Sequence, residues 1–231
     1  MSKKNDSCDH TCFMCQHVLK EWWQLIELQR KNIIIRKGQQ FIYENSEVDG
    51  IYFVQEGLVK IHKNWSEKDT IIRFASKDDI IGFRGITTEN TLFPISATAL
   101  EKTRLCFIEI NFFKSLLKAN PSLTYELMMF FADELYVSEI KMGNMIHLPA
   151  KSRIAWCLVR LIKRFGTDVD GKINITINKT DLASYAGTTY ETCYRILSEL
   201  SSEKIIVMKD KNIIIQRHDQ LVEVSENVSN V

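Results

Sequence analysis

One long apolar stripe between two prolines limits the folds open to this chain of 231 residues. Pro121 opens a helical pattern that runs to Leu148 and stops before Pro149. The apolar residues recur mainly at threes, fours and fives: Leu123, Leu127, Phe130, Phe131, Leu135, Ile140 and Met145. A helix of this kind is about 40 Å long at 1.5 Å per residue, too long for one small domain to cover. We expect a helix that spans two domains or a two-stranded seam between subunits, and its length favours the seam.

The segment before this helix has the period of two that is typical of half-buried strands. Short strands separated by Gly and Asp turn signals are predicted at 33–35, 41–43, 51–54, 58–62, 70–74, 95–99 and 105–108. Such evenly spaced strands predict a small antiparallel sandwich or jelly roll. Within it, alternation puts Lys60 and His62 on a solvated face opposite Val59 and Ile61. A short helix over 19–28 is expected to pack on this sandwich.

The C-terminal part predicts a winged helix-turn-helix. An amphipathic helix over 151–165 and a strand over 173–177 lead into it, and strands at 205–208 and 212–215 follow as a hairpin or wing. Thr180 is expected to cap a short helix, and Gly187 supplies a tight turn. Thr188 with Glu191 has the spacing of a capping box for a second helix. This arrangement is typical of helix-turn-helix geometry.

Charge and composition exclude several other classes of protein. A formal net charge of +1 rules out a uniformly basic surface, so nucleic-acid binding must come from a local patch. The chain has no apolar run of about 18 residues and no signal-peptide pattern, so we expect no membrane partner and a cytoplasmic protein. In that reducing compartment, its six cysteines indicate metal binding, redox chemistry or burial rather than disulfides.

The order of these segments resembles a known family. A sandwich, a long helix and a helix-turn-helix that contains Asp181-Leu182-Ala183 and Glu191-Thr192-Cys193-Tyr194-Arg195 are similar to the Crp/Fnr family of bacterial transcription regulators. The resemblance extends from about Cys8 to Ile215. It implies an α+β fold with an N-terminal antiparallel jelly roll of the cyclic-nucleotide-binding type, a long dimerisation helix and a C-terminal winged helix-turn-helix.

The same resemblance implies a domain organisation and a set of partners. The expected parts are a cysteine-rich tail at 1–18, a jelly-roll sensory domain at 19–120, a dimerisation helix at 121–148 and a DNA-binding domain at 149–231. The expected function is that of a homodimeric regulator and not an enzyme. Its expected partners are a second copy of the chain, palindromic double-stranded DNA and RNA polymerase.

In this family a Glu and an Arg four residues apart read the DNA half-site, and they map onto Glu191 and Arg195. Arg can donate two hydrogen bonds to a guanine, and Glu can accept one from a cytosine. Residues at i and i+4 share one helix face, so both can enter one major groove. The alternative is a surface ion pair, but the position just after a helix-turn-helix turn favours DNA. The further candidate DNA contacts are Tyr194, which departs from the smaller residues of the family, and Thr180, Thr189, Tyr190 and Thr192 as phosphate contacts.

The resemblance also offers cyclic AMP as an effector, and the residues argue against it. Cyclic-nucleotide-binding members hold the ribose with a Glu after a Gly and the phosphate with an Arg-Ser pair. The matching stretches here read Ile81-Gly82-Phe83 and Ile95-Ser96. A buried phosphate without its cation is strongly disfavoured, so cyclic AMP is not expected to bind.

The cysteines indicate a different sensor. Cys8, Cys12 and Cys15, together with Cys106, resemble the set that holds a [4Fe-4S] cluster in oxygen-sensing Fnr proteins. Fnr proteins commonly carry another cysteine a few residues past the Cys15 position, where this chain has Glu21. Cys8 would therefore be the fourth ligand.

Other interpretations of the thiols stay open. A zinc site could use Cys8, Cys12, Cys15 and one of Cys106, His10 or His17. The N-terminal spacing also matches radical S-adenosylmethionine enzymes, but those need an α/β barrel that this chain is too short to form. Idle thiols are a further alternative, and an unknown small molecule could then bind in the jelly roll.

Overall fold

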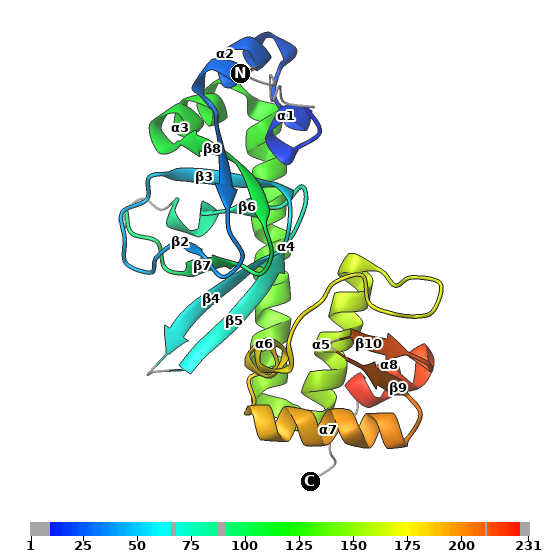
Figure 1. Ribbon diagram of the computed structural model, residues 1–231. Coiled ribbons are helices and arrows are strands. Elements are labelled where there is room, and N and C mark those ends of the chain that lie inside the picture. The colour runs from blue at the N-terminus through cyan, green and yellow to red at the C-terminus, as the bar shows by residue number, and fades with distance from the viewer. Residues whose placement is uncertain (1–9, 66–67, 87–90, 211, 227–231) are drawn as a thin grey trace. The chain divides into compact units, whose positions relative to one another are not determined.

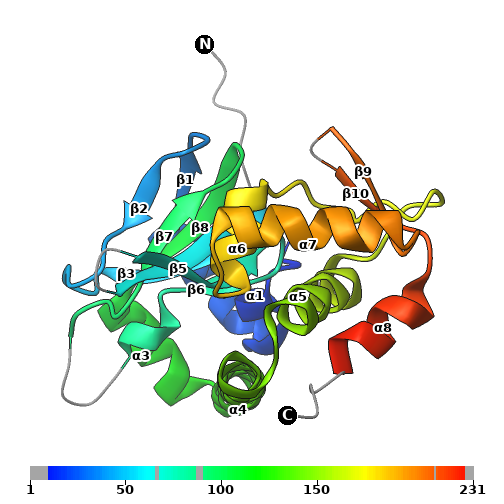
Figure 2. The same cartoon turned by 90° about the horizontal axis from the view of Figure 1, so that it is seen from below.

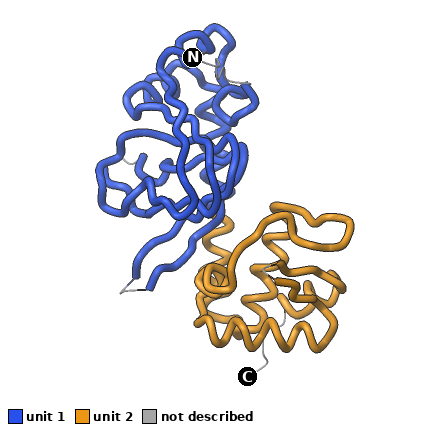
Figure 3. The backbone as a smooth tube through the Cα atoms, in the orientation of Figure 1, with its two compact units in different colours: residues 1–134 blue, residues 135–231 orange. Residues whose placement is uncertain are grey.

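The computed structural model describes residues 10–65, 68–86, 91–210 and 212–226. The chain divides into two compact units, Met1–Glu134 and Leu135–Val231 (Figure 3). Their boundary falls inside the longest helix, α4 (Pro121–His147), which has 27 residues. The long helix predicted between the two prolines is therefore present, and it contributes residues to both units.

The first unit is built on two four-stranded antiparallel sheets (Figure 1). The strand orders are β1-β8-β3-β6 and β2-β7-β4-β5. The strands are β1 (Lys31–Ile35), β2 (Gln40–Ile42), β3 (Gly50–Glu56), β4 (Val59–Trp65), β5 (Lys68–Ala75), β6 (Ile80–Ile81), β7 (Ser96–Ala99) and β8 (Thr103–Glu109). The sequence predicted every one of these except β6, whose two residues are too few to carry a period.

Helices of the first unit extend its core beyond the sheets. They are α1 (Phe13–His17), the 3-10 turn η1 (Lys20–Trp22), α2 (Trp23–Gln29), the 3-10 turn η2 (Phe83–Gly85) and α3 (Ile110–Ala119). The helix expected over 19–28 begins as η1 and continues as α2. Neither α1 nor α3 was predicted from the sequence. One hydrophobic cluster joins α1, α2 and α3 to β3, β8 and the start of α4, and a second lies among the strands.

The expectation of a solvated His62 was wrong. His62 is only 9% exposed, and its Nδ1 lies 2.5 Å from Asp69 Oδ1 while its Nε2 lies 2.9 Å from Thr98 Oγ1. The pairing of β4 with β5 shifts register between Ile61 and His62. A bulge of this kind breaks the alternation of faces, so two consecutive residues are buried.

The second unit contains the helix-turn-helix and its wing. Its elements are the last part of α4, then α5 (Ala150–Phe165), α6 (Lys179–Tyr185), α7 (Tyr190–Ser202), β9 (Ile206–Lys209), β10 (Asn212–Ile215) and α8 (His218–Glu226). The strands β9 and β10 pair antiparallel as the predicted hairpin. The helix α8, which packs against α5 (Figure 2), was not predicted.

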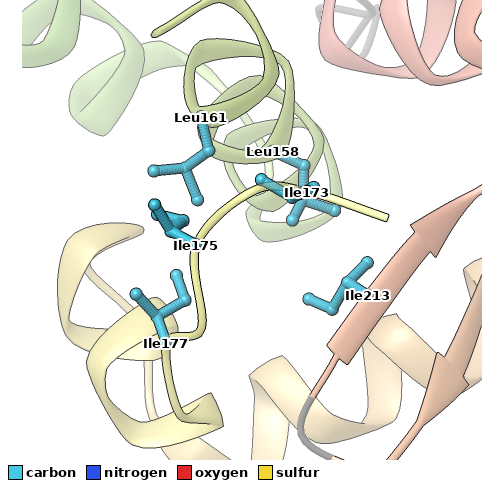
Figure 4. A pocket seen from close by; sticks show the side chains of 6 residues that line it. All are labelled: Leu158, Leu161, Ile173, Ile175, Ile177 and Ile213. Atoms are coloured by element: carbon cyan, nitrogen blue, oxygen red, sulfur yellow. The ribbon is translucent and has the colours of Figure 1, made fainter. Parts of the chain in front are cut away.

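The strand predicted over 173–177 is absent from the described residues. The segment makes only isolated bridges at its start, Thr167 with Ile173 and Lys172 with Ile214. Its alternating isoleucines instead line an apolar pocket (Figure 4), formed by Leu158, Leu161, Ile173, Ile175, Ile177 and Ile213. The alternation of isoleucines in this segment therefore results from their burial against α5, and not from pairing in a sheet.

Both predicted helix caps are displaced along the chain. The side chain of Asn178, not Thr180, accepts a hydrogen bond from the Asp181 amide at 2.6 Å and caps α6. Thr189, not Thr188, accepts from the Thr192 amide at 3.3 Å and caps α7. No described helix is both long enough and apolar enough to cross a membrane.

Candidate DNA interface and sensory site

Helix α7 separates a buried face from an exposed one. Its buried residues are Cys193, Ile196, Leu197 and Leu200. Glu191 and Arg195 are exposed one turn apart, and Tyr190 and Tyr194 beside them are 47% and 49% exposed. Packing of the apolar face therefore fixes the helix while its polar and aromatic face stays accessible.

The exposed face carries one ion pair, but not the pair considered from the sequence. Arg195 Nη1 lies 2.5 Å from Glu199 Oε1, one turn towards the C-terminus. Glu191 occupies the first turn of α7, where the helix dipole favours a negative charge. The rings of Tyr190 and Tyr194 stack with centroids 6.3 Å apart. Glu191 and Arg195 thus share one accessible face, as the sequence predicted.

The threonines proposed as phosphate contacts lie near the N-terminal ends of two helices. Thr189 precedes α7, and Thr192 lies in its first turn. Thr180 is an exposed residue within the first turn of α6. Hydroxyl groups and helix N-terminal amides are common phosphate partners in protein–DNA interfaces.

Arg153 of α5 joins the end of α4 to the turn of the helix-turn-helix. Its Nε donates to the Ala186 carbonyl at 3.2 Å, and its Nη2 donates to the Gly187 carbonyl at 3.3 Å. Its Nη1 donates to the carbonyls of Met145 and Leu148, both at 3.3 Å. One guanidinium therefore satisfies carbonyls at the ends of both α4 and α6, a role that no sequence spacing indicated.

Lys141 makes a second link between α4 and α6. Its Nζ lies 4.0 Å from the centroid of the Tyr185 ring, a cation–π contact. Burial lowers the pKa of Lys141 to about 8, although the nearby Cys157 opposes the shift. Burial likewise raises the pKa of the Cys157 thiol to about 12, so Cys157 is a neutral core side chain.

Three of the four candidate cluster ligands lie in one buried region. Cys12, Cys15 and Cys106 are 4%, 2% and 0% exposed and belong to the same hydrophobic cluster. Cys12 immediately precedes α1, Cys15 lies within it, and Cys106 lies on β8. Cys8 falls outside the described residues. Within the described residues, no three His, Cys, Asp or Glu side chains gather closely enough to hold a metal ion. The donors fit thiolate ligation, but the described residues do not close the ligand set.

The cysteine-bearing segment contacts the start of α4. The rings of Phe13 and Phe130 are 5.9 Å apart. The Leu19 amide donates to Asn120 Oδ1 at 2.9 Å, immediately before α4 begins. His10, an alternative zinc ligand, stacks on Trp23 with ring centroids 4.2 Å apart.

The stretches compared with the nucleotide cradle line a small pocket in the sandwich. Its walls are Ile61, Arg73, Ile81, Gly82, Phe83, Arg84 and Ile95. Phe83 and Ile95 are buried there, in place of the acid and the base that nucleotide-binding members use. Arg73 and Arg84 enter the same pocket from β5 and η2. Neither arginine was predicted as a site residue, although a charged residue in the buried half of β5 indicates a partner or a ligand.

The apolar stripe of α4 consists of two different faces. Leu123 and Leu127 are buried in the first unit, whereas Leu135 is 61% exposed. One exposed row follows the alternating three- and four-residue spacing of a heptad: Tyr125, Met128, Ala132, Leu135, Glu139, Met142 and Ile146. Five of these seven are large apolar residues, which is typical of a helix seam.

Comparison with protein families defines the class of this chain. Residues 33–120 match the cyclic nucleotide-binding domain, and residues 152–224 match the Crp-like helix-turn-helix domain. The two matches coincide with the sandwich and with the unit that contains α7. The chain therefore combines a domain of the cyclic-nucleotide-binding type with a Crp-like helix-turn-helix domain, as DNA-binding regulators do.

Individual relatives agree with this class. The chain is 28% identical to the anaerobic regulatory protein of Bacillus subtilis over 88% of this chain and 86% of that protein. It is 26% identical to the fumarate and nitrate reduction regulatory protein of Vibrio cholerae over 87% and 81% of the two chains. The fold is similar to that of FixK2 from Bradyrhizobium japonicum, with a TM-score of 0.77, 21% identity and coverage of 87% and 99%. The chain belongs to the Crp/Fnr family and is a DNA-binding transcription regulator.

Proposed function

We propose that this regulator acts as a homodimer on palindromic double-stranded DNA and is controlled by an oxygen- or redox-labile [4Fe-4S] cluster. The proposed ligands are Cys8, Cys12, Cys15 and Cys106. The observation that carries the proposal is the burial of Cys12 and Cys15 in the same core cluster as Cys106. The names of the relatives, which refer to anaerobic regulation and to fumarate and nitrate reduction, are in line with this signal.

The proposed dimer uses the exposed heptad row of α4. Two copies of the row would bury Tyr125, Met128, Leu135, Met142 and Ile146 against each other, which removes large apolar side chains from water. A twofold dimer presents two α7 helices to successive major grooves, about 34 Å apart on DNA. RNA polymerase stays a proposed further partner.

In the proposed DNA complex, Arg195 donates to the O6 and N7 of a guanine and Glu191 accepts from a cytosine. Arg195 must first leave Glu199, with which it pairs in the absence of DNA. Tyr190 and Tyr194 extend the same face. Thr180, Thr189 and Thr192 then contact the phosphate backbone and fix the register.

The cysteines can influence α4 through the packing around them. Four thiolates on one cluster would fix α1 against β8, because Cys12 and Cys15 belong to the first element and Cys106 to the second. Phe13, between these two cysteines, contacts Phe130 of α4. Loss of this ligation would release α1 and with it part of the packing that supports α4. Dimerisation and DNA binding are expected to weaken together.

Purification without oxygen tests the proposal. We expect a coloured protein with about four iron and four sulfide per chain, and Cys8→Ala, Cys12→Ala, Cys15→Ala and Cys106→Ala should each lose them. Cys157→Ala is the matched control, because it removes a buried thiol outside the proposed set and should keep the iron. Colourless, iron-free protein that binds DNA as tightly as the anaerobic preparation would refute the cluster, and stoichiometric zinc would favour a structural metal instead.

A further inference from the structure

A carboxylate of α4 lies between the two arginines of the sandwich pocket. Glu134 Oε2 is 3.1 Å from Arg73 Nε and 3.5 Å from Arg84 Nη2. Arg73 is 7% exposed as a residue, and the side chain of Glu134 is 15% exposed. Arg73 comes from β5, Arg84 from η2 and Glu134 from the long helix, so this contact joins three elements of the first unit.

The surroundings of Arg73 hold its guanidinium in place. Its Nη2 donates to the Ile80 carbonyl, and its Nη1 lies 3.8 Å from Asp79 Oδ1. The guanidinium carbons of Arg73 and Arg84 lie 5.4 Å and 5.5 Å from the centroid of the Phe83 ring. Phe83 is the residue at the position where nucleotide-binding members carry their ribose-binding acid. The pocket therefore still contains cationic groups. They come from Arg73 and Arg84, and not from the position of Ile95, where nucleotide-binding members carry their phosphate-binding arginine.

Two guanidinium groups that converge in a partly buried pocket need an anion. Burial of like charges without a counter-charge is strongly unfavourable, and removal of one partner from a buried ion pair leaves the other uncompensated. In a ligand-binding sandwich, a small anionic molecule could supply this charge. Here Glu134 supplies it from within the chain to both arginines, and Asp79 adds a longer contact to Arg73 alone.

We infer that Glu134 is a built-in substitute for an anionic effector: it pairs with the two arginines that line the sandwich pocket and so fastens α4 to the sandwich without a diffusible ligand. The vacated position would take a small oxyanion such as phosphate. The inference goes beyond the proposed function, because it concerns the sandwich and α4 alone. It holds in cluster-free protein as well as in cluster-loaded protein.

The test compares full-length variants in sodium phosphate and in sodium chloride of equal ionic strength. In chloride, Glu134→Gln should lower the midpoint of thermal unfolding by about 5 to 10 °C. Phosphate should restore at least half of this loss, and calorimetry should give a phosphate affinity at least tenfold higher than that of the unaltered chain. Asp133→Asn is the matched control, since it removes the same charge from an exposed neighbouring position and should behave like the unaltered chain in both salts.

Two further variants keep the test decisive if Glu134→Gln folds poorly. Glu134→Asp keeps the charge on a shorter side chain and should show a smaller loss with a smaller phosphate rescue. The double variant Arg73→Met with Glu134→Met replaces a buried pair by apolar groups and should fold without any response to phosphate. A Glu134→Gln midpoint equal to that of the unaltered chain would overturn the inference. Equal phosphate stabilisation of the unaltered chain, or of the double variant, would do the same, as would no phosphate effect on Glu134→Gln.

Discussion

Glu139 is the one charged residue in the exposed heptad row of α4, and its replacement is the sharpest test of the proposed dimer. In this row it follows Leu135 and precedes Met142, both of which are exposed. In a twofold seam each such position faces its own copy, so two carboxylates would approach each other. We expect Glu139→Leu to strengthen the dimer.

The magnitude follows from two contributions. Two like charges about 6 Å apart cost about 3 kcal/mol at an effective dielectric constant of about 20. Burial of a leucine side chain contributes roughly 1.5 to 3 kcal/mol per subunit. Glutamates at the seam edge can turn towards water, which reduces the first contribution. Burial in both subunits alone leaves a net gain of about 3 to 6 kcal/mol, which corresponds to a dissociation constant about 100- to 10,000-fold lower.

Sedimentation equilibrium on cluster-free protein measures this constant directly. Glu139→Gln separates the effect of charge from that of burial, and it should give a smaller gain than Glu139→Leu. Asp133→Leu makes the same kind of change at an exposed position outside the heptad row, and it should leave the constant unchanged. An unaltered dissociation constant for Glu139→Leu, or an equal gain for Asp133→Leu, would show that α4 does not pair along this row.

Three further predictions concern the second unit. Arg195→Ala should lower the affinity for the specific site by ~1 to 3 kcal/mol and relax the preference at one G·C pair; an equal loss on random DNA in competition binding would remove its base-reading role. Gly187→Ala should lower the free energy of unfolding by about 1 to 2 kcal/mol in denaturant titrations, because φ at Gly187 is +62°, whereas an unchanged stability would contradict this strain. Because burial lowers the pKa of Lys141 to about 8 from 10.5, the unfolded chain binds more protons between these pH values, and stability should rise with pH from about 8 to 9. Lys141→Met should abolish this rise, and a slope that survives the substitution would assign it to another group.

The sequence predicted the fold correctly where the period of the apolar residues matched the secondary structure that buries them. The strands of the sandwich and the long helix between its two prolines follow from the periods of their own residues. The error at 173–177 has a physical reason, since Ile173, Ile175 and Ile177 alternate to line a pocket on α5. The helix caps were displaced because Asn178 and Thr180 both offer side-chain acceptors near the start of α6, and sequence cannot choose between such neighbours.

Some parts of the candidate sites could likewise be predicted from local spacing, whereas others depend on contacts between distant residues. Glu191 and Arg195 could be placed on one helix face because their spacing alone sets that geometry, and the structure shows that this face is exposed. The contact of Glu134 with Arg73 joins residues far apart in the sequence, and the role of Arg153 depends on four backbone carbonyls. No residue pattern encodes either contact, since both arise only after the elements have packed.

The junction at Arg153 has a consequence for operator length. Met142 and Ile146 of the exposed row share the last turns of α4 with Lys141 and Met145. Lys141 contacts Tyr185, and Arg153 ties the Met145 carbonyl to the turn before α7. In the proposed dimer, the side-chain size at Met142 and Ile146 would therefore set how far apart the two recognition helices stand. The number of base pairs between half-sites then becomes a property of these two positions, while α7 alone decides which bases are read.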